Sequence, residues 1–299
     1  MFVEIRKKGK KKKYYLVHSY RMGDKVKRIS RYLGSDLDEK ELAKLRKIAE
    51  KLILEEIKEK NILEFELSKK EIELYKKYEK SIKIEHLQKL NWKRFTEIFT
   101  YNTNAIEGSQ VELSEVKDLL EHKEEPIDDD DLETLNVAKA VEFIRSTKEK
   151  ISIEFIKKIH YICFKDTKSF AGKIRKNVEV GIRDAKGNIV HAGAPSKEVK
   201  KLLKELCEWY QKHKNKYPPV LVAALVHNQF ENIHPFQDGN GRVGRLLLNY
   251  ALLEHNYPPI NIRLKNRMRY YACLQKFEKT NDIKLTLKFL INQYKKQHR

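Results

Sequence analysis

The sequence predicts a mainly α-helical protein with a small β unit at its N-terminus. Residues 1–34 are rich in β-forming residues, whereas apolar residues recur at helical spacing through nearly all of the chain from residue 68 onward. One strand–turn–strand pattern, at residues 175–190, interrupts the helical part and predicts a β-hairpin. At 299 residues the chain is long enough for a sizeable core, in one large domain or two.

The N-terminal β unit is expected to be a three-stranded meander. Strands are predicted at residues 2–6, 13–20 and 25–33, with a turn at residues 22–24. Such a meander is marginally stable alone and needs a partner to pack on. The next stretch, residues 37–62, has an apolar helical face and is expected to be an arm or linker helix.

The rest of the chain is expected to be helical outside the hairpin. Helical spacing is present in segments 68–90, 92–104, 112–122, 132–147, 152–165 and from 196 to the C-terminus. The acidic run at residues 128–131 precedes one of these segments, so we interpret it as helix capping rather than metal binding. The predicted organisation is a basic β unit at 1–36, a helical arm at 37–92 and a helical domain at 93–299, with its core at about 150–260.

The composition limits the kind of protein. The chain is 40% hydrophobic and 35% charged, and no apolar run approaches the ~20 residues of a membrane span. The N-terminus has no apolar signal core, and the three cysteines lie far apart in the sequence. We therefore expect a cytoplasmic protein with reduced thiols and no membrane association.

Positive charge is concentrated at the N-terminus. The formal net charge is +20, and residues 1–34, with eight Lys and four Arg against two acidic residues, hold +10 of it. Such a basic patch suggests a polyanion partner, nucleic acid above all. The alternative is a lysine-rich solvated face, which is also common in proteins from hot environments.

One short segment gathers most of the candidate chemistry. HPFQDGNGRVGR, residues 234–245, contains an imidazole, a carboxylate, a glycine-rich turn and two guanidiniums. Asp-Gly and Asn-Gly are hairpin signals. However, the flanking stretches 220–230 and 243–253 lack strand alternation and are typical of buried helices. The segment is therefore predicted to join two helices.

The residue types in this segment fit a site for a magnesium nucleotide. The turn at 239–241 presents backbone N–H groups directly before a helix N-terminus, an arrangement that binds phosphate. Arg242 and Arg245 are three residues apart on the new helix, so both can point at one ligand. Asp238 is placed to hold Mg²⁺ against phosphate oxygens, and His234 to remove a proton from an incoming hydroxyl.

The segment resembles the complete signature of the Fic family, HxFx(D/E)GNGRxxR. The neighbouring HxxFxxI at 227–233, YPPI at 257–260 and RxxYY at 267–271 agree, and the resemblance covers about residues 95–295. It implies a mainly helical Fic fold with the β-hairpin as a flap. It also implies an enzyme that uses ATP and Mg²⁺ to transfer AMP to a Ser, Thr or Tyr hydroxyl of target proteins, including itself.

The resemblance implies roles for individual residues. His234 corresponds to the general base and Asp238 to the Mg²⁺ ligand. The residues implied to contact the nucleotide are Gly239, Asn240, Gly241, Arg242, Arg245, Val180, Gly181, Tyr270 and Tyr271. Glycines and Arg242 would cradle the α- and β-phosphates, and Arg245 would reach the γ-phosphate. Glu278 departs from some family members, which have an Asn there, so the preference for ATP over UTP stays open.

The hairpin and two tyrosines complete the implied site. Val178, Val180 and Gly181 would offer a strand edge to the target peptide, which holds a hydroxyl in line with the α-phosphorus while demanding little of the target sequence. Tyr270 and Tyr271 fall where the family encloses the adenine.

A second stretch, TNAIEG at residues 103–108, resembles the family's inhibitory motif (S/T)xxxE(G/N). In this interpretation the Glu107 carboxylate pairs with Arg245 and fills the seat of the γ-phosphate. The alternative is an ordinary surface Glu before a C-terminal Gly cap. In some family members the same Glu positions water that removes AMP, so the resemblance also makes Glu107 a candidate for de-AMPylation.

Two functions from different classes follow. The first is an autoinhibited protein adenylyltransferase. The alternative is a nucleic-acid-binding regulator, in which the basic N-terminal β unit defines the function. The intact His234, Asp238 and Arg245 favour the enzyme. A homodimer is a further expectation, whereas the target protein and the signal that releases Glu107 cannot be named from the sequence.

Overall fold

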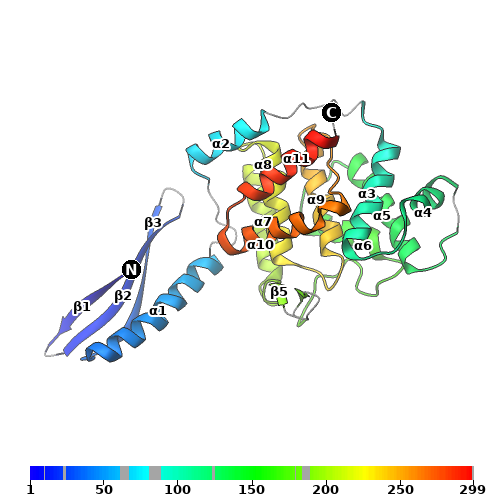
Figure 1. Cartoon of the computed structure of the whole chain (residues 1–299). Coiled ribbons are helices and arrows are strands. Elements are labelled where there is room, and N and C mark those ends of the chain that lie inside the picture. Colours follow the sequence, from blue (N-terminus) through cyan, green and yellow to red (C-terminus); the bar gives the residue numbers. More distant parts are fainter. Residues whose placement is uncertain are drawn as a thin grey trace. The chain divides into compact units, whose positions relative to one another are not determined.

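The computed structural model describes residues 1–9, 11–22, 25–60, 67–80, 89–122, 125–178, 180–183 and 189–297. These residues form two compact units, Met1–Glu71 and Ile72–Arg299, drawn in Figure 1. The domain boundaries expected at residues 36 and 92 stay predictions.

The first unit is a three-stranded antiparallel sheet with a helix. Its strands, β1 (Phe2–Lys8), β2 (Lys11–Met22) and β3 (Lys25–Ser35), pair in chain order, which confirms the predicted meander with longer strands. The helix α1 (Glu39–Lys60) follows.

Helix α1 supplies the partner that the sheet needs. Leu16 of β2 and Ala49 and Ile53 of α1 are buried against one another. The partly buried residues around them are Met1, Val3, Ile29, Leu33 and Ile57. Burial of these apolar side chains stabilises a meander that is marginal by itself. The segment expected to be an arm is therefore part of this unit's core.

The second unit is mostly helical, as predicted. Its elements are α2 (Lys69–Glu79, which begins just before the unit), α3 (Trp92–Glu107), α4 (Leu113–Lys117), the π-helix η2 (Asp118–His122), α5 (Asp129–Ser146), α6 (Ile153–Phe164), α7 (Val199–His213), α8 (Pro219–Ile233), α9 (Asn240–Leu253), the 3-10 turn η3 (Leu264–Asn266), α10 (Arg267–Thr280) and α11 (Lys284–Gln297). Asp128 caps α5, since its Oδ1 accepts the backbone N–H of Asp131 at 2.9 Å. No helix in the described ranges is both long and apolar enough to cross a bilayer.

Helices α8 and α9 form the centre of this unit. Helix α8 packs on α7, α9, α10 and α11, and α9 packs on α3, α5 and α6 as well (Figure 1). Every residue from Val220 to Glu231 is buried, which explains why the run Val220–Val226 is apolar on all sides rather than on one face. Proline at the first position and the αL residue His234 at the end set the limits of α8.

The hairpin is present but begins later than the sequence suggested. Strand β4 (Gly181–Arg183) pairs antiparallel with β5 (Ile189–Ala192), and the expected turn at 184–188 lies outside the described residues. Buried Arg175 donates from Nη1 to the carbonyl of Val178 at 2.8 Å and from Nε to the carbonyl of His234 at 2.7 Å. Val178 therefore precedes the strand, and its carbonyl bonds to a side chain that also holds the end of α8.

Candidate active site

The turn between α8 and α9 is held in one conformation by its own residues. His234 has φ 51°, and Gly239, at the start of α9, has φ 75°, a conformation that suits glycine. The Asn240 side chain accepts from the N–H of Phe236 and donates to its carbonyl, both at 2.9 Å. The Asn240 side chain therefore braces the turn, and its backbone N–H remains at the N-terminus of α9.

A histidine from α6 forms a second brace. The N–H of Gly172 donates to Nδ1 of His160 at 2.8 Å, so the proton of the neutral ring is on Nε2, which lies 3.1 Å from the carbonyl of Asp238. The ring also stacks on Phe236, with centroids 3.8 Å apart. Burial lowers the pKa of His160 to about 4, so the brace is neutral at pH 7.

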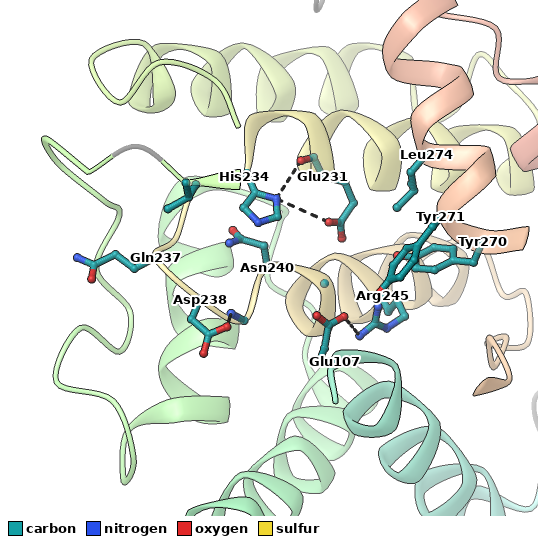
Figure 2. A pocket seen from close by; sticks show the side chains of 13 residues that line it. Glu107, Glu231, His234, Gln237, Asp238, Asn240, Arg245, Tyr270, Tyr271 and Leu274 are labelled. Carbon is teal, nitrogen blue, oxygen red and sulfur yellow. Dashed lines mark hydrogen bonds and ion pairs between the residues drawn. The ribbon is translucent and has the colours of Figure 1, made fainter. Parts of the chain in front are cut away.

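Beside the turn lies a pocket of about 210 Å³. Its lining residues come from α3, α8, α9, α10, the turn and the start of the hairpin, as Figure 2 shows: Glu107, Val180, Glu231, His234, Gln237, Asp238, Gly239, Asn240, Gly241, Arg245, Tyr270, Tyr271 and Leu274. The structure thus brings together most of the candidate site residues. Of those expected, Val178, Gly181 and Arg242 are not among the lining residues.

His234 has the geometry of a base. Its Nδ1 lies 3.2 Å from the carbonyl oxygen of Glu231. A carbonyl oxygen can only accept a hydrogen bond, so Nδ1 bears the proton. In this tautomer Nε2 carries the lone pair that can take a proton. The side chain is 13% exposed and faces the pocket (Figure 2).

Glu231 is a pocket residue that the sequence reasoning missed. Its Oε2 lies 4.0 Å from Nδ1 of His234, where a carboxylate favours the protonated imidazole. A Cβ on Gly244 would lie 2.1 Å from Glu231 Oε1, so this glycine lets the carboxylate approach α9. The available signal was an acidic residue three positions before His234, at the end of a helix predicted to be buried.

Glu107 and Arg245 form the ion pair that the second motif suggested. Arg245 Nη2 lies 2.7 Å from Glu107 Oε1, its Nε donates to Thr103 Oγ1 at 2.7 Å, and Nη2 also donates to the Thr103 carbonyl at 2.9 Å. Both ends of the Thr103–Gly108 stretch have a structural role, since Thr103 binds Arg245 and Gly108 caps α3 with φ 106°. Burial by itself would lower the pKa of Arg245, but the Glu107 carboxylate together with Tyr270 and Glu231 keeps the pKa above its ordinary value.

The Glu107 carboxylate also lies over the N-terminus of α9. A Cβ on Gly241 would lie 2.2 Å from Glu107 Oε1, so only glycine allows this approach. The first turn of α9 contains no acidic residue, and its N-cap Gly239 has no side chain to cap it. An acidic group from a distant helix therefore lies where the partial positive charge of α9 favours an anion.

Arg242 pairs with a different glutamate from Arg245. Its Nη1 pairs with Glu133 of α5, and its guanidinium lies 4.4 Å from the ring centroid of Phe164. Glu133 is buried and also accepts from Thr167 Oγ1 at 2.8 Å and pairs with Lys168 at 3.3 Å. Arg242 Nη2 also lies 3.9 Å from Oδ2 of the pocket residue Asp238, so this arrangement does not decide whether both arginines point at one ligand. Contact of Arg242 with phosphate stays a prediction.

Asp238 is the candidate metal ligand. Its side chain is 54% exposed; Oδ1 accepts from the N–H of Gly239 at 2.7 Å, and Oδ2 lies 3.8 Å from Lys168 Nζ. Within the described part of the chain no three His, Cys, Asp or Glu side chains cluster to hold a metal. A lone, accessible carboxylate at a phosphate site nevertheless fits Mg²⁺, which is usually held by one or two carboxylates together with phosphate oxygens and water.

The two tyrosines line the far side of the pocket. Tyr270 is buried, and its hydroxyl lies 2.9 Å from Nε2 of His227, whose pKa burial lowers to about 3. The Tyr271 hydroxyl donates to the carbonyl of Ile106 at 3.2 Å. With Leu274 they form a largely apolar wall, which suits an aromatic base better than a phosphate.

Comparisons with known proteins agree with this site. Residues 150–252, which include the α8–α9 turn, match the model of the Fic/DOC family. Proteins named "Protein adenylyltransferase Fic" from Nematostella vectensis and Drosophila ananassae are each 30% identical, over 58% and 64% of this chain. The chain spans about two-fifths of the length of these relatives, 41% and 38%.

Solved structures share the fold. A Fic domain-containing signaling protein from Bacteroides thetaiotaomicron has a TM-score of 0.63 at 25% identity, over 74% of this chain and 91% of that chain. Fic-1 from C. elegans has a TM-score of 0.62 at 23% identity, over 88% and 76%. Residues 150–252 thus match the Fic/DOC family, and the helical architecture is shared with solved Fic structures, in agreement with the sequence resemblance.

Proposed function

We propose that this chain is an autoinhibited protein adenylyltransferase that transfers AMP from ATP to a hydroxyl of a protein substrate, itself included. The observation that carries this proposal is the Glu107 carboxylate, which lies over Gly241 and pairs with Arg245 at 2.7 Å. A carboxylate at that point is chemically a stand-in for a phosphate. The names of the 30%-identical relatives support the activity.

His234 is the base in this proposal. Nε2 takes the proton of the acceptor hydroxyl as its oxygen forms a bond to the α-phosphorus, and the bond from that phosphorus to the bridging oxygen breaks. Pyrophosphate leaves and AMP stays on the protein. Glu231, 4.0 Å from Nδ1, then stabilises the imidazolium.

In this proposal the glycine turn and Arg245 bind the triphosphate. Backbone N–H groups of residues 239–241 offer donors at the start of α9, and Arg245 takes the γ-phosphate once Glu107 withdraws. Asp238 is the residue that would hold Mg²⁺, which neutralises phosphate charge when bound. Tyr270 and Tyr271 face the adenine, and Val180 lines the pocket where the hairpin approaches it.

The hairpin is proposed to dock the target. Val178 is 39% exposed, and Gly181 opens β4. A two-stranded sheet has unpaired backbone groups at its edges, to which an extended peptide can add as a strand. Such docking would select a hydroxyl by position rather than by a long recognition sequence.

The test is labelling with two forms of ATP. Purified chain and its Glu107→Gly variant are incubated with Mg²⁺ and ATP that carries radiolabel on the α- or the γ-phosphate. The proposal expects α-label on protein and a mass increase of one AMP per site. Label from the γ-phosphate would instead indicate a kinase, and absence of α-label in both proteins would exclude the proposed activity.

De-AMPylation by Glu107 is a second candidate function of the same pocket. It is favoured by the position of the carboxylate at the pocket wall, 31% exposed, where it can orient water toward a bound phosphoester. Chain labelled with AMP and freed of ATP should lose the label with Glu107 intact and keep it in Glu107→Gly. Equal loss from both would remove this role. A homodimer and a cytoplasmic location stay predictions.

A further inference from the structure

The N-terminal sheet has two unlike faces. Paired residues of an antiparallel sheet lie on the same face, and successive residues alternate. Leu16 and its neighbours in the core therefore point toward α1. The opposite face carries the residues Phe2, Glu4, Arg6, Lys13, Tyr15, Val17, Ser19, Arg28, Ser30 and Tyr32, according to the pairing register. We call this set the open face.

Aromatic rings lie on the open face and are accessible. Phe2 is 53% and Tyr32 is 55% exposed. The rings of Tyr15 and Tyr32 are 5.2 Å apart, on adjacent strands. A large aromatic side chain buries about 150–250 Å² when it is packed, so leaving it in water forgoes that stabilisation. Exposed aromatic rings that lie together therefore indicate a surface that binds a partner.

Cations lie among these rings. The guanidinium of Arg6 is 4.3 Å from the ring centroid of Tyr15, and Arg6 and Arg28 both pair with Glu4. Their side chains are still 51% and 54% exposed. The Arg28–Glu4 pair joins β3 to β1 across β2, and Val17 on β2 is fully buried. The two arginines are thus pre-positioned at the surface, while Glu4 neutralises only one of them.

Lysines extend the positive charge beyond the face. Lys11 continues the open face beyond Lys13, whereas Lys7, Lys12 and Lys27 are exposed on the same three strands but on the side of α1, according to the register. With them the first 34 residues hold a formal +10 of the chain's +20. This charge and the ring pattern are complementary to a polyanion that also presents flat apolar surfaces.

We propose that the open face binds single-stranded nucleic acid, with bases stacked on Phe2 and Tyr32 and phosphates on Arg6, Arg28, Lys11 and Lys13. Exposed aromatic rings between cations are the arrangement that unstacked bases require. A duplex keeps its bases stacked on one another, so it would use the cations and leave the rings unexplained. This activity is independent of the Fic pocket.

The experiment is an anisotropy titration of the full chain with a labelled 15-nucleotide mixed-sequence single strand, and with the same strand annealed to its complement, at 50 and 200 mM NaCl. The single strand should bind more tightly than the duplex and lose affinity at the higher salt. Tyr32→Ser should weaken binding about tenfold, as expected for the loss of one stacked base. Arg28→Gln should weaken binding and flatten the salt dependence by about 0.7 in logarithmic slope.

Three control variants separate stacking from general effects. Tyr32→Phe keeps the ring but loses the bond to Ser35, so it should bind nearly as wild type even if Tyr32→Ser proves misfolded. Tyr161→Ser removes an equally exposed ring, 53%, from α6 and should change nothing. Arg46→Gln removes an exposed arginine from α1 and should weaken binding less than Arg28→Gln. Duplex binding as tight as that of the single strand, loss of affinity in Tyr32→Phe, or no binding at 50 mM NaCl would overturn the proposal.

Discussion

Arg242 and Arg245 lie one turn apart on α9, and each pairs with a glutamate from another helix, but the two pairs differ. The partner of Arg242, Glu133, is buried and also binds Thr167 and Lys168. The partner of Arg245, Glu107, is 31% exposed at a pocket wall. The first pair is built as a permanent part of the core. In the second pair an incoming anion can displace the glutamate. One motif can therefore contain a fixed and an exchangeable ion pair side by side.

The largest expected effect concerns the base beside the exchangeable pair. His234→Ala, made in the activated Glu107→Gly background, should lower the rate of AMP transfer by about 10²- to 10⁴-fold. Binding of ATP, measured by calorimetry, should be nearly unchanged. A double variant that transfers AMP as fast as Glu107→Gly would break the link between the Glu107–Arg245 pair and the chemistry assigned to His234.

The free energy of unfolding should distinguish the two ion pairs. Glu133→Ala leaves Arg242 charged and buried without its carboxylate, so the free energy of unfolding should fall by about 3–5 kcal/mol. Glu107→Ala also leaves a buried arginine without its carboxylate, but Thr103 still accepts two bonds from Arg245 and Glu107 is itself 31% exposed, so the loss should be smaller, about 1–3 kcal/mol. Urea unfolding of both variants checks this. Equal losses would mean that the Glu107–Arg245 pair is as permanent as the other.

The buried His160, which braces the turn before α9, should make the free energy of unfolding depend on pH. His160 has a pKa near 4 when folded, against about 6.5 for an unperturbed His. As pH falls through 6.5 the unfolded chain binds the proton first, so stability present above pH 6.5 is lost down to about pH 4, by about 3 kcal/mol.

Unfolding midpoints between pH 4 and pH 8 measure this loss. His160→Gln should flatten the profile by that amount at the cost of a looser turn. His122→Gln, at an exposed histidine on η2, is the control and should leave the profile as in wild type. A profile that His160→Gln does not change would contradict the assignment.

The smallest expected effect concerns Glu231. If its carboxylate stabilises protonated His234, Glu231→Gln should lower the transfer rate about tenfold, because the imidazolium that forms during transfer loses its acidic neighbour. The pH–rate profile should move to lower pH, because the imidazole gives up its proton more easily. A lower rate with an unmoved profile would assign Glu231 to packing against Gly244 alone.

Sequence alone predicted the residues that belong to contiguous motifs. The glycine turn, Asp238 and Arg245 lie within twelve residues, and Glu107 lies in a second recognisable stretch. The residues that hold the turn could not be found in this way. His160 is one histidine on an apolar helix, and Glu133 meets Arg242 across 109 residues of chain. Only the packing of α5 and α6 against α9 shows that they belong to the site.

The fold was predictable where local patterns decide it, and less so where tertiary contacts do. The meander and the helical body follow from residue spacing and were expected. The hairpin began later than expected because buried Arg175 binds the carbonyl of Val178. Arg175 is held in place by the carbonyl of His234, 59 residues away, and that contact leaves no local trace in the sequence.

Autoinhibition by Glu107 is tested most directly by the ratio of the initial self-labelling rates of Glu107→Gly and wild type, with α-labelled ATP and Mg²⁺. If the Glu107 carboxylate holds the seat of the γ-phosphate on Arg245, its removal should raise the rate on the order of 10²-fold, because correct alignment of the α-phosphorus is worth about that much. Glu107→Asp should fall between the two, Glu142→Gln on the exposed side of α5 should match wild type, and Glu107→Gly with Arg245→Ala should be inactive. A Glu107→Gly rate no higher than that of wild type, in a protein whose labelling requires His234, would contradict the account.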